Sequence, residues 1–413
     1  RFGFFPAFSL AWNIAEETFI KKHLKWMNMF KLRYSYGKVG SDKLKIGDTT
    51  YRFPYLYTIK DDGNGWTWSD YGSPDNVYTG MQYTQLASNN VTWEIATKHD
   101  AGVDLSLFND KFTATVDYFH EQRDGIYMER KYLPGIVGVN SNPKANVGSV
   151  RSKGFDGNFA YKQKIGKVNL TVRGNFTYSK NEILEKDEEN AVYPYQKEAG
   201  YRVNQAKGLI ALGLFKDYDD IRNSPKQSWG DVMPGDIKYR DVNGDGKINS
   251  KDQVMISQYG NVPRIQYGIG LDMTYKSFDF GMFFNGSAQR TIMVSGIMPF
   301  RGDASTGDRN VMKFIANDYW SEANPNPDAK FPRLGITDSQ VANNSVNSTY
   351  WMHNGRFIRF KTLELGYSFP YCRVYINGDN LAVWSPFKEW DPELSWNAYP
   401  LQRTINIGVQ LKF

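Results

Sequence analysis

The sequence predicts an all-β protein, a transmembrane antiparallel β-barrel of which this chain holds about eleven strands. Polar and apolar residues alternate with a period of two over many segments, which places one set of side chains on each face of a strand. The connections between these segments are alternately short and long. Aromatic residues are abundant, with 27 Tyr, 26 Phe and 11 Trp, yet no stretch approaches the roughly 18 consecutive apolar residues that a membrane helix needs.

The clearest alternation lies in residues 168–179, where polar residues separate the members of an apolar set. That set is Val168, Leu170, Val172, Phe176 and Tyr178. We expect these side chains to face lipid and their polar neighbours to face the lumen of a barrel. A turn at residues 164–167 joins this run to a similar one at residues 155–161, which predicts a hairpin.

Eleven runs of this kind follow one another along the chain. They occupy residues 4–14, 30–38, 101–107, 112–118, 155–161, 168–179, 265–275, 278–284, 356–369 (with a bulge near Thr362), 373–384 and 401–413. The short connections are residues 15–29, 108–111, 164–167, 276–277 and 370–372. The long connections are residues 39–94, 124–152, 181–263, 291–355 and 385–400.

In a meander, alternate connections lie at opposite ends of the sheet, so the short turns share one end and the long loops the other. This segregation is typical of an outer-membrane barrel, and a soluble β-sandwich or propeller gives no reason for it. Barrels of this class have even strand numbers, and the chain begins at Arg1 without an initiator Met or a signal peptide. We therefore expect residues 1–413 to be the C-terminal part of a barrel, with further strands preceding it.

Composition argues against several other classes of protein. The net charge of +6 is spread among interleaved acids and bases, which gives no support to nucleic-acid binding. The single cysteine, Cys372, excludes an internal disulfide and a zinc site built on thiolates. The sequence contains no HExxH, no GxSxG and no phosphate-binding loop, and the four His are scattered, so we expect no enzyme activity.

One segment of the long loop at residues 181–263 has the spacing of a calcium loop. Residues 241–252 read DVNGDGKINSKD, with oxygen ligands at the first, third and fifth positions and Gly at the sixth. The predicted ligands are the side chains of Asp241, Asn243 and Asp245, the carbonyl of Lys247 and the carboxylate of Asp252. Because Asp replaces the usual Glu at the last position, the site would be weaker or would tolerate Mg²⁺. The alternative is an Asx-Gly turn without a metal.

Two further features are candidates for contacts with other molecules. Trp66, Trp68 and Tyr71 lie in the loop at residues 39–94, where their rings could stack on sugars or peptide side chains, or instead pack the loop against a neighbour. The chain ends on Phe413 after an alternating strand, which resembles the signal read by the barrel-assembly machinery.

Motifs along the whole chain resemble those of the SusC/RagA family of TonB-dependent transporters. They are residues 31–40 (KLRYSYGKVG), 92–94 (TWE), 146–148 (NVG), 153–154 (KG), 234–237 (PGDI), 241–246 (DVNGDG), 260–263 (GNVP), 365–367 (LGY), 377–381 (NGDNL) and 400–413. The resemblance implies a barrel of about 22 strands with a plug domain inside, of which this chain would be half. It also implies a TonB-binding segment at the N-terminus and a SusD-like lipoprotein lid on the outer loops.

The plug domain and the TonB-binding segment are absent from this sequence, so energy coupling is implied by the resemblance alone. Near residues 370–373 the family has a longer connection than this chain. The leading hypothesis is TonB-energised import of a bulky nutrient, a glycan or an oligopeptide, across the bacterial outer membrane, with transporter and lid pairs assembling as a dimer. The alternatives are a passive porin and a secreted calcium-dependent β protein that binds or cleaves glycans.

Overall fold

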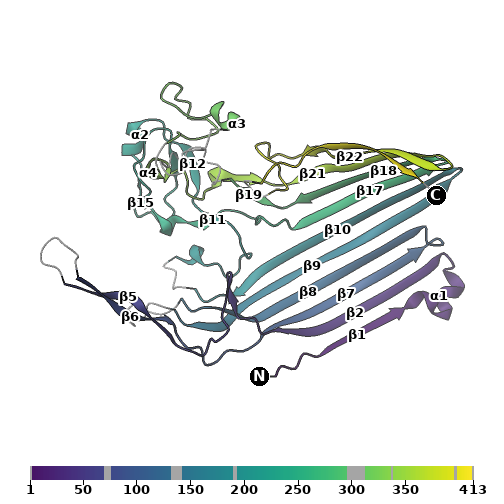
Figure 1. The fold of residues 1–413 in the computed structure, drawn as a ribbon, viewed down its shortest axis with the longest axis horizontal. Coiled ribbons are helices and arrows are strands. Elements are labelled where there is room, and N and C mark those ends of the chain that lie inside the picture. The colour runs from purple at the N-terminus through teal and green to yellow at the C-terminus, as the bar shows by residue number, and fades with distance from the viewer. Residues whose placement is uncertain are drawn as a thin grey trace.

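The computed structural model describes residues 2–68, 76–131, 142–188, 193–294, 312–335, 338–394 and 398–411. Eleven strands form one antiparallel sheet in which each strand pairs with the next in chain order (Figure 1). They are β1 (Ala7–Asn13), β2 (Met27–Ser41), β7 (Glu94–Leu107), β8 (Phe112–Glu129), β9 (Lys144–Ile165), β10 (Val168–Glu185), β17 (Ile265–Tyr275), β18 (Phe278–Ala288), β21 (Phe357–Ser368), β22 (Cys372–Trp384) and β23 (Thr404–Leu411). The all-β prediction and the strand number are confirmed. Among the described helices, none has the length and apolar character needed to span a bilayer.

Short connections lie together at one end of the sheet, and long loops lie at the other (Figure 1). Between β7 and β8, Phe108, Asn109 and Asp110 all take positive φ, from 56° to 62°, and Asn28 Oδ1 accepts a hydrogen bond from Asn109 N at 2.8 Å. Gly166, at φ 61°, makes the two-residue turn between β9 and β10, where a left-handed residue matches the twist of the strands. The connection from β1 to β2 contains the 3₁₀ turn η1 (Ile14–Glu16) and helix α1 (Thr18–His23).

The two faces of the sheet differ as the alternation predicts. The apolar set of β10 lies directly opposite apolar residues of β17, namely Tyr275, Met273, Leu271, Tyr267 and Ile265. Ion pairs lie on the other face, including Arg33 with Asp104 at 2.8 Å and Arg173 with Asp272 at 2.9 Å. The bulge expected near Thr362 is confirmed by a register shift between Phe360 and Thr362.

Several strands extend beyond their predicted ends. β8 continues to Glu129 and β9 begins at Lys144, so about half of the predicted loop at residues 124–152 is strand. The prediction was wrong here because it followed side-chain alternation, whereas the hydrogen bonds of a sheet join backbone groups and continue beneath polar side chains. Register shifts near Gly125, at φ 69°, also interrupt the alternation at this point.

The long loops contain short elements of their own. Between β2 and β7 lie β3 (Lys45–Ile46), β4 (Thr49–Thr50), β5 (Thr58–Trp68) and β6 (Asn76–Gln85). Between β10 and β17 lie η3 (Pro194–Gln196), β11 (Lys207–Gly208), β12 (Ala211–Leu214), α2 (Tyr218–Arg222), β13 (Lys226–Gln227), β14 (Ile237–Tyr239), β15 (Lys247–Ile248), η4 (Ser250–Asp252) and β16 (Val254–Met255). Between β18 and β21 lie β19 (Thr291–Met293), α3 (Lys313–Ala316), α4 (Asp338–Val341), η6 (Thr349–Trp351) and β20 (Met352–Asn354).

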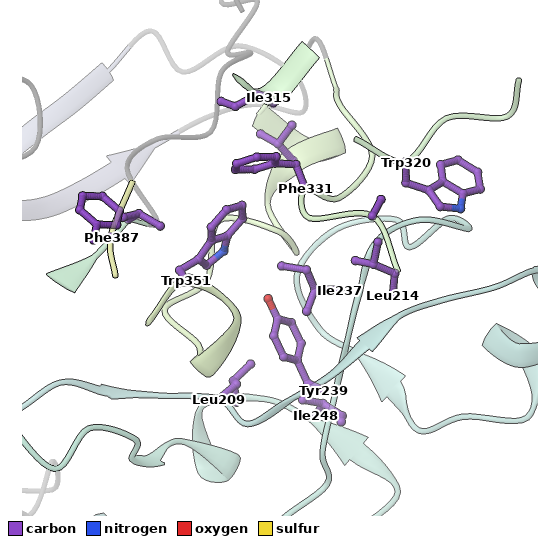
Figure 2. Close-up of a cluster of buried hydrophobic side chains, with 13 residues drawn as sticks. Leu209, Leu214, Ile237, Tyr239, Ile248, Ile315, Trp320, Phe331, Trp351 and Phe387 are labelled. Atoms are coloured by element: carbon purple, nitrogen blue, oxygen red, sulfur yellow. The ribbon is translucent and has the colours of Figure 1, made fainter. Parts of the chain in front are cut away.

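Three long loops fold together around one hydrophobic cluster, which we call the outer-loop core (Figure 2). Its members are Leu209, Leu214, Ile237, Tyr239, Ile248, Val294, Ile315, Trp320, Ala329, Phe331, Val341, Trp351 and Phe387. They come from the β10–β17 loop, the β18–β21 loop and the segment after β22. Burying large side chains such as Trp351, which is 1% exposed, stabilises a packed unit above the end of the sheet.

Candidate metal loop and lumen face

The segment at residues 241–252 folds as a tight loop that hydrogen-bonds to itself. Asp241 accepts hydrogen bonds from Gly244 N at 2.7 Å and Gly246 N at 2.8 Å. Asn243 Oδ1 accepts from Asp245 N at 3.1 Å, and Asp245 Oδ1 accepts from Lys247 N at 2.9 Å. Three of the predicted ligand side chains thus turn toward the same short stretch of backbone, at Gly residues whose positive φ, 74° and 78°, permits the turn.

Asp252 closes this loop from its far end. Its carboxylate is fully buried and accepts hydrogen bonds from Val242 N at 2.9 Å and from Asn249 N at 2.8 Å. Asn249 in turn caps η4, so the two residues form a capping box. Asp252 therefore joins the beginning of the loop to its last turn through these backbone hydrogen bonds.

Neighbouring residues fix this loop to the outer-loop core. Ile248, the eighth position of the motif, is fully buried in that core. From η3, Tyr195 donates a hydrogen bond from its hydroxyl to Lys251 O at 2.8 Å, and Gln196 donates to the same carbonyl at 3.1 Å. The ring of Tyr193 stacks on that of Tyr195 at 5.3 Å. The sequence reasoning missed these contacts because they come from residues 55 or 56 positions earlier.

Among the residues that the structure describes, no three or more His, Cys, Asp or Glu side chains gather in a way that could hold a metal. The predicted ligand set includes three such acids, Asp241, Asp245 and Asp252, and in this structure their carboxylates do not gather into a cluster of that kind; the Asn243 amide and the Lys247 carbonyl would complete the set. The calcium site stays a prediction.

A buried polar network lies within the outer-loop core, and the sequence reasoning did not identify it. The carboxylate of Asp236 is fully buried and accepts from Arg333 Nε at 3.0 Å, Arg333 Nη2 at 3.1 Å, Asn344 Nδ2 at 2.8 Å and Met233 N at 2.8 Å. Burial raises the pKa of Asp236, and the Arg333 guanidinium opposes that shift. The network joins the β10–β17 loop to the β18–β21 loop.

A second pair of amides extends this connection. Gln227 donates from Nε2 to Asn343 Oδ1 at 2.6 Å and accepts from Tyr239 N at 2.7 Å. Asn343 donates to Ile237 O at 2.9 Å. Asn343 lies more than 100 positions from both Gln227 and Ile237 in the chain, and each buried polar group satisfies another. The two loops therefore hold each other in one arrangement.

The predicted aromatic contacts fall largely outside the described residues. Trp66 and Trp68 lie in β5, where the backbone pairs with β6, but their side chains are not described. Tyr71 lies outside the described residues altogether. Exposed rings that the sequence reasoning did not select stand nearby in the same loop, including Tyr57, 61% exposed, and Tyr83, 47% exposed.

Phe413, the predicted assembly signal, also lies outside the described residues, since the description of β23 ends at Leu411. The connection between β21 and β22, where the family resemblance implied a longer segment, is a tight turn in which Phe369 N donates to Cys372 O at 2.7 Å.

The polar face of the sheet carries paired charges across several strands. Arg33 on β2 contacts Asp117 on β8 at 2.8 Å as well as Asp104 on β7. Arg373 on β22 bridges Asp279 on β18 and Glu364 on β21. One face is thus apolar and suited to lipid, and the other is charged and suited to a water-filled or plugged lumen. These features define a membrane-type β-barrel protein.

Comparison with known proteins gives the family. The family model for the TonB dependent receptor-like β-barrel matches residues 1–381, and the chain belongs to this family. TonB-dependent receptor P3 of Formosa agariphila is 24% identical over 457 aligned residues and TonB-dependent receptor SusC of Bacteroides thetaiotaomicron is 25% identical over 440; both alignments cover 100% of this chain. The structure of the RagAB peptide transporter superposes on 99% of the chain with a TM-score of 0.69 and 21% identity.

These matches confirm the SusC/RagA resemblance noted in the motifs. The chain spans 42% of the length of the P3 receptor, 40% of SusC and 43% of the matched RagAB chain. The relatives are described as receptors and not as enzymes.

Proposed function

We propose that this chain is the C-terminal part of the barrel of an outer-membrane importer that takes up a bulky nutrient, a glycan or an oligopeptide, with energy from a TonB complex. The observation that carries the proposal is the eleven-stranded sheet with one apolar and one ion-paired face, within a family of TonB-dependent receptors. Large outer loops that pack against one another are better suited to a transporter that captures a large solute than to a pore through which solutes diffuse freely.

We further propose a SusD-like surface lipoprotein as the lid and the barrel-assembly machinery as the insertion partner. The name of the matched RagAB structure describes a peptide transporter, which supports an oligopeptide, and a glycan stays in the proposal as the other substrate class. The outer-loop core supports docking of a lid because it presents a fixed surface instead of separate loops.

The test uses the full-length gene in its own host. Deleting it should abolish growth on one class of polymer, glycan or peptide, while growth on the corresponding monomers continues. Collapse of the proton gradient should stop uptake by the wild type, because TonB-dependent transport needs that energy. Uptake that continues unchanged after collapse would favour the passive porin, and unchanged growth of the deletion strain on both polymer classes would contradict import.

The loop at residues 241–252 is proposed to bind Ca²⁺, or Mg²⁺ in its place, as a brace for the outer loops. Asp241 and Asp245 bring two carboxylates into one turn, and a cation would remove their repulsion. Sites of this class outside the cell bind calcium with dissociation constants of about 10⁻⁴ to 10⁻³ M. At a tenfold excess of calcium over the dissociation constant, binding would stabilise the loop by about 1.4 kcal/mol.

This site can be tested on the purified full-length protein. Calcium should slow proteolysis of the β10–β17 loop in the wild type, and the D241A/D245A variant should lose that protection while its barrel stays folded. D219A/D231A is the matched control, since both of its aspartates are exposed in the same loop and lie outside the twelve positions. Equal protection by calcium in the two double variants would reduce the motif to an acidic turn.

A further inference from the structure

A row of basic side chains crosses four neighbouring strands on the apolar face of the sheet, near the end that carries the long loops. His99 on β7 lies opposite His120 on β8, His120 lies opposite Lys153 on β9, and Lys153 lies opposite Lys180 on β10. We call His99, His120, Lys153 and Lys180 the basic row. Because strand partners point to the same side, all four side chains project from the face that carries the lipid-facing set.

The position of the basic row along the strands matches a membrane interface. The next row of the same face, one step toward the short turns, is aromatic: Tyr34, Ala101, Tyr118, Phe155 and Tyr178 lie opposite one another in that order. The rings of Phe155 and Tyr178 are 5.2 Å apart. Aromatic residues collect at the level of lipid headgroups in barrels, so the basic row stands at or just outside that level.

The protein balances the charges of the basic row only in part. Lys153 and Lys180 are exposed, face each other directly, and have no ion pair within the described residues. Like charges directly opposite one another destabilise a strand pair unless an anion stands between them. Glu182, the acid of the adjoining row, pairs with Arg151 at 2.8 Å and also interacts electrostatically with Lys180 and Lys153, so one carboxylate faces three cations and a net positive charge remains.

The neighbouring contacts place the histidines at the same surface. His99 Nδ1 and Tyr34 Oη are 2.8 Å apart, and the rings of His99 and His120 are 6.0 Å apart. Both rings can present a nitrogen to an acceptor oxygen beside the two ammonium groups. Two ammonium groups and two imidazoles on a flat surface, beside aromatic rings, complement a phosphate attached to an acyl-chain lipid more closely than they complement a soluble anion.

We propose that the basic row binds the headgroup phosphate of an outer-leaflet lipid and so fixes a lipid against strands β7 to β10. The inference rests on the outer-membrane placement of the proposed function. The protein supplies charge and hydrogen-bond donors to the phosphate, while the aromatic row and the apolar set below it contact the acyl chains.

The test measures binding of monophosphoryl lipid A to the full-length protein, purified from membranes in a mild detergent and stripped of lipid, by native mass spectrometry. Each Lys near such a headgroup contributes about fivefold to affinity, so K153Q/K180Q should weaken binding about 25-fold. K162Q/K164Q is the matched control, since these exposed lysines lie on the same strand but project from the opposite face. It should bind like the wild type.

Four further measurements make the outcome specific. K153R/K180R should retain binding because it keeps both charges, and K180Q alone should lose about fivefold, which keeps the test valid if the double variant fails to insert. Dephosphorylated lipid should bind equally weakly to wild type and K153Q/K180Q, and excess inorganic phosphate should not displace the lipid. Unchanged lipid binding by a folded K153Q/K180Q, or ready displacement by inorganic phosphate, would overturn the proposal.

Failure of the proposed import function is separable from failure of this inference. Lipid binding is read on purified protein and does not depend on uptake. If the wild type shows no import, yet K153Q/K180Q weakens lipid binding, only the import proposal is contradicted. If import is normal and K153Q/K180Q leaves lipid binding unchanged, only the lipid site is contradicted.

Discussion

The Asp236→Ala substitution should open the outer-loop core without unfolding the barrel. The change removes a fully buried carboxylate that accepts two hydrogen bonds from Arg333, one from Asn344 and one from Met233 N. It leaves the mostly buried guanidinium of Arg333, 14% exposed, without its acid. Removing one partner of a buried ion pair costs about 3–5 kcal/mol. The free energy for local opening of the core should fall by this amount, so the open state should become about 10²- to 10⁴-fold more populated.

Hydrogen exchange of the full-length protein, followed by mass spectrometry, measures this effect directly. Amides in residues 207–257 and 312–335 should exchange faster in D236A by that factor, while amides of β9 and β10 keep wild-type rates because their ladder does not pass through the core. D219A is the control: Asp219 pairs with Arg222 at the surface, and its loss should change little. Equal exchange of the two loops in D236A and wild type would refute the view that this pair joins them.

Other predictions concern pH, the lipid face and assembly. Burial lowers the pKa of His353 below its usual 6.5, so the stability it contributes is present above that value and is lost as pH falls through the lower folded-state pKa. Protection of the outer-loop core against hydrogen exchange, corrected for the intrinsic pH dependence of amide exchange, should therefore decrease as the pH falls below about 6.5, and less so in H353Q. Val172→Lys, on the apolar face, should cost about 2–4 kcal/mol in urea unfolding, whereas Thr171→Lys on the opposite face should be tolerated, and equal costs would contradict the assignment of faces. Deleting Phe413 should lower the amount of heat-resistant folded protein in the outer membrane, and wild-type amounts would argue against an assembly signal.

The sequence by itself determined the features that depend on near neighbours along the chain. Alternation with a period of two gave the strand number, the two faces of β10 and the position of the short turns, because the side chains of a strand point alternately to either face whatever the partner strand is. The twelve-position spacing likewise located a loop that does turn back on itself at Gly244 and Gly246.

Only the tertiary structure decided what depends on residues far apart in the chain. The strand ends at Glu129 and Lys144 follow backbone hydrogen bonds, which carry no side-chain signature. The pairing of Asp236 with Arg333 joins residues 97 positions apart, and the PGDI motif at residues 234–237 marks the acid without indicating which base is its partner. The basic row exists only because the registers of four strands align, and a shift of one residue in any pair would move its members to the opposite face.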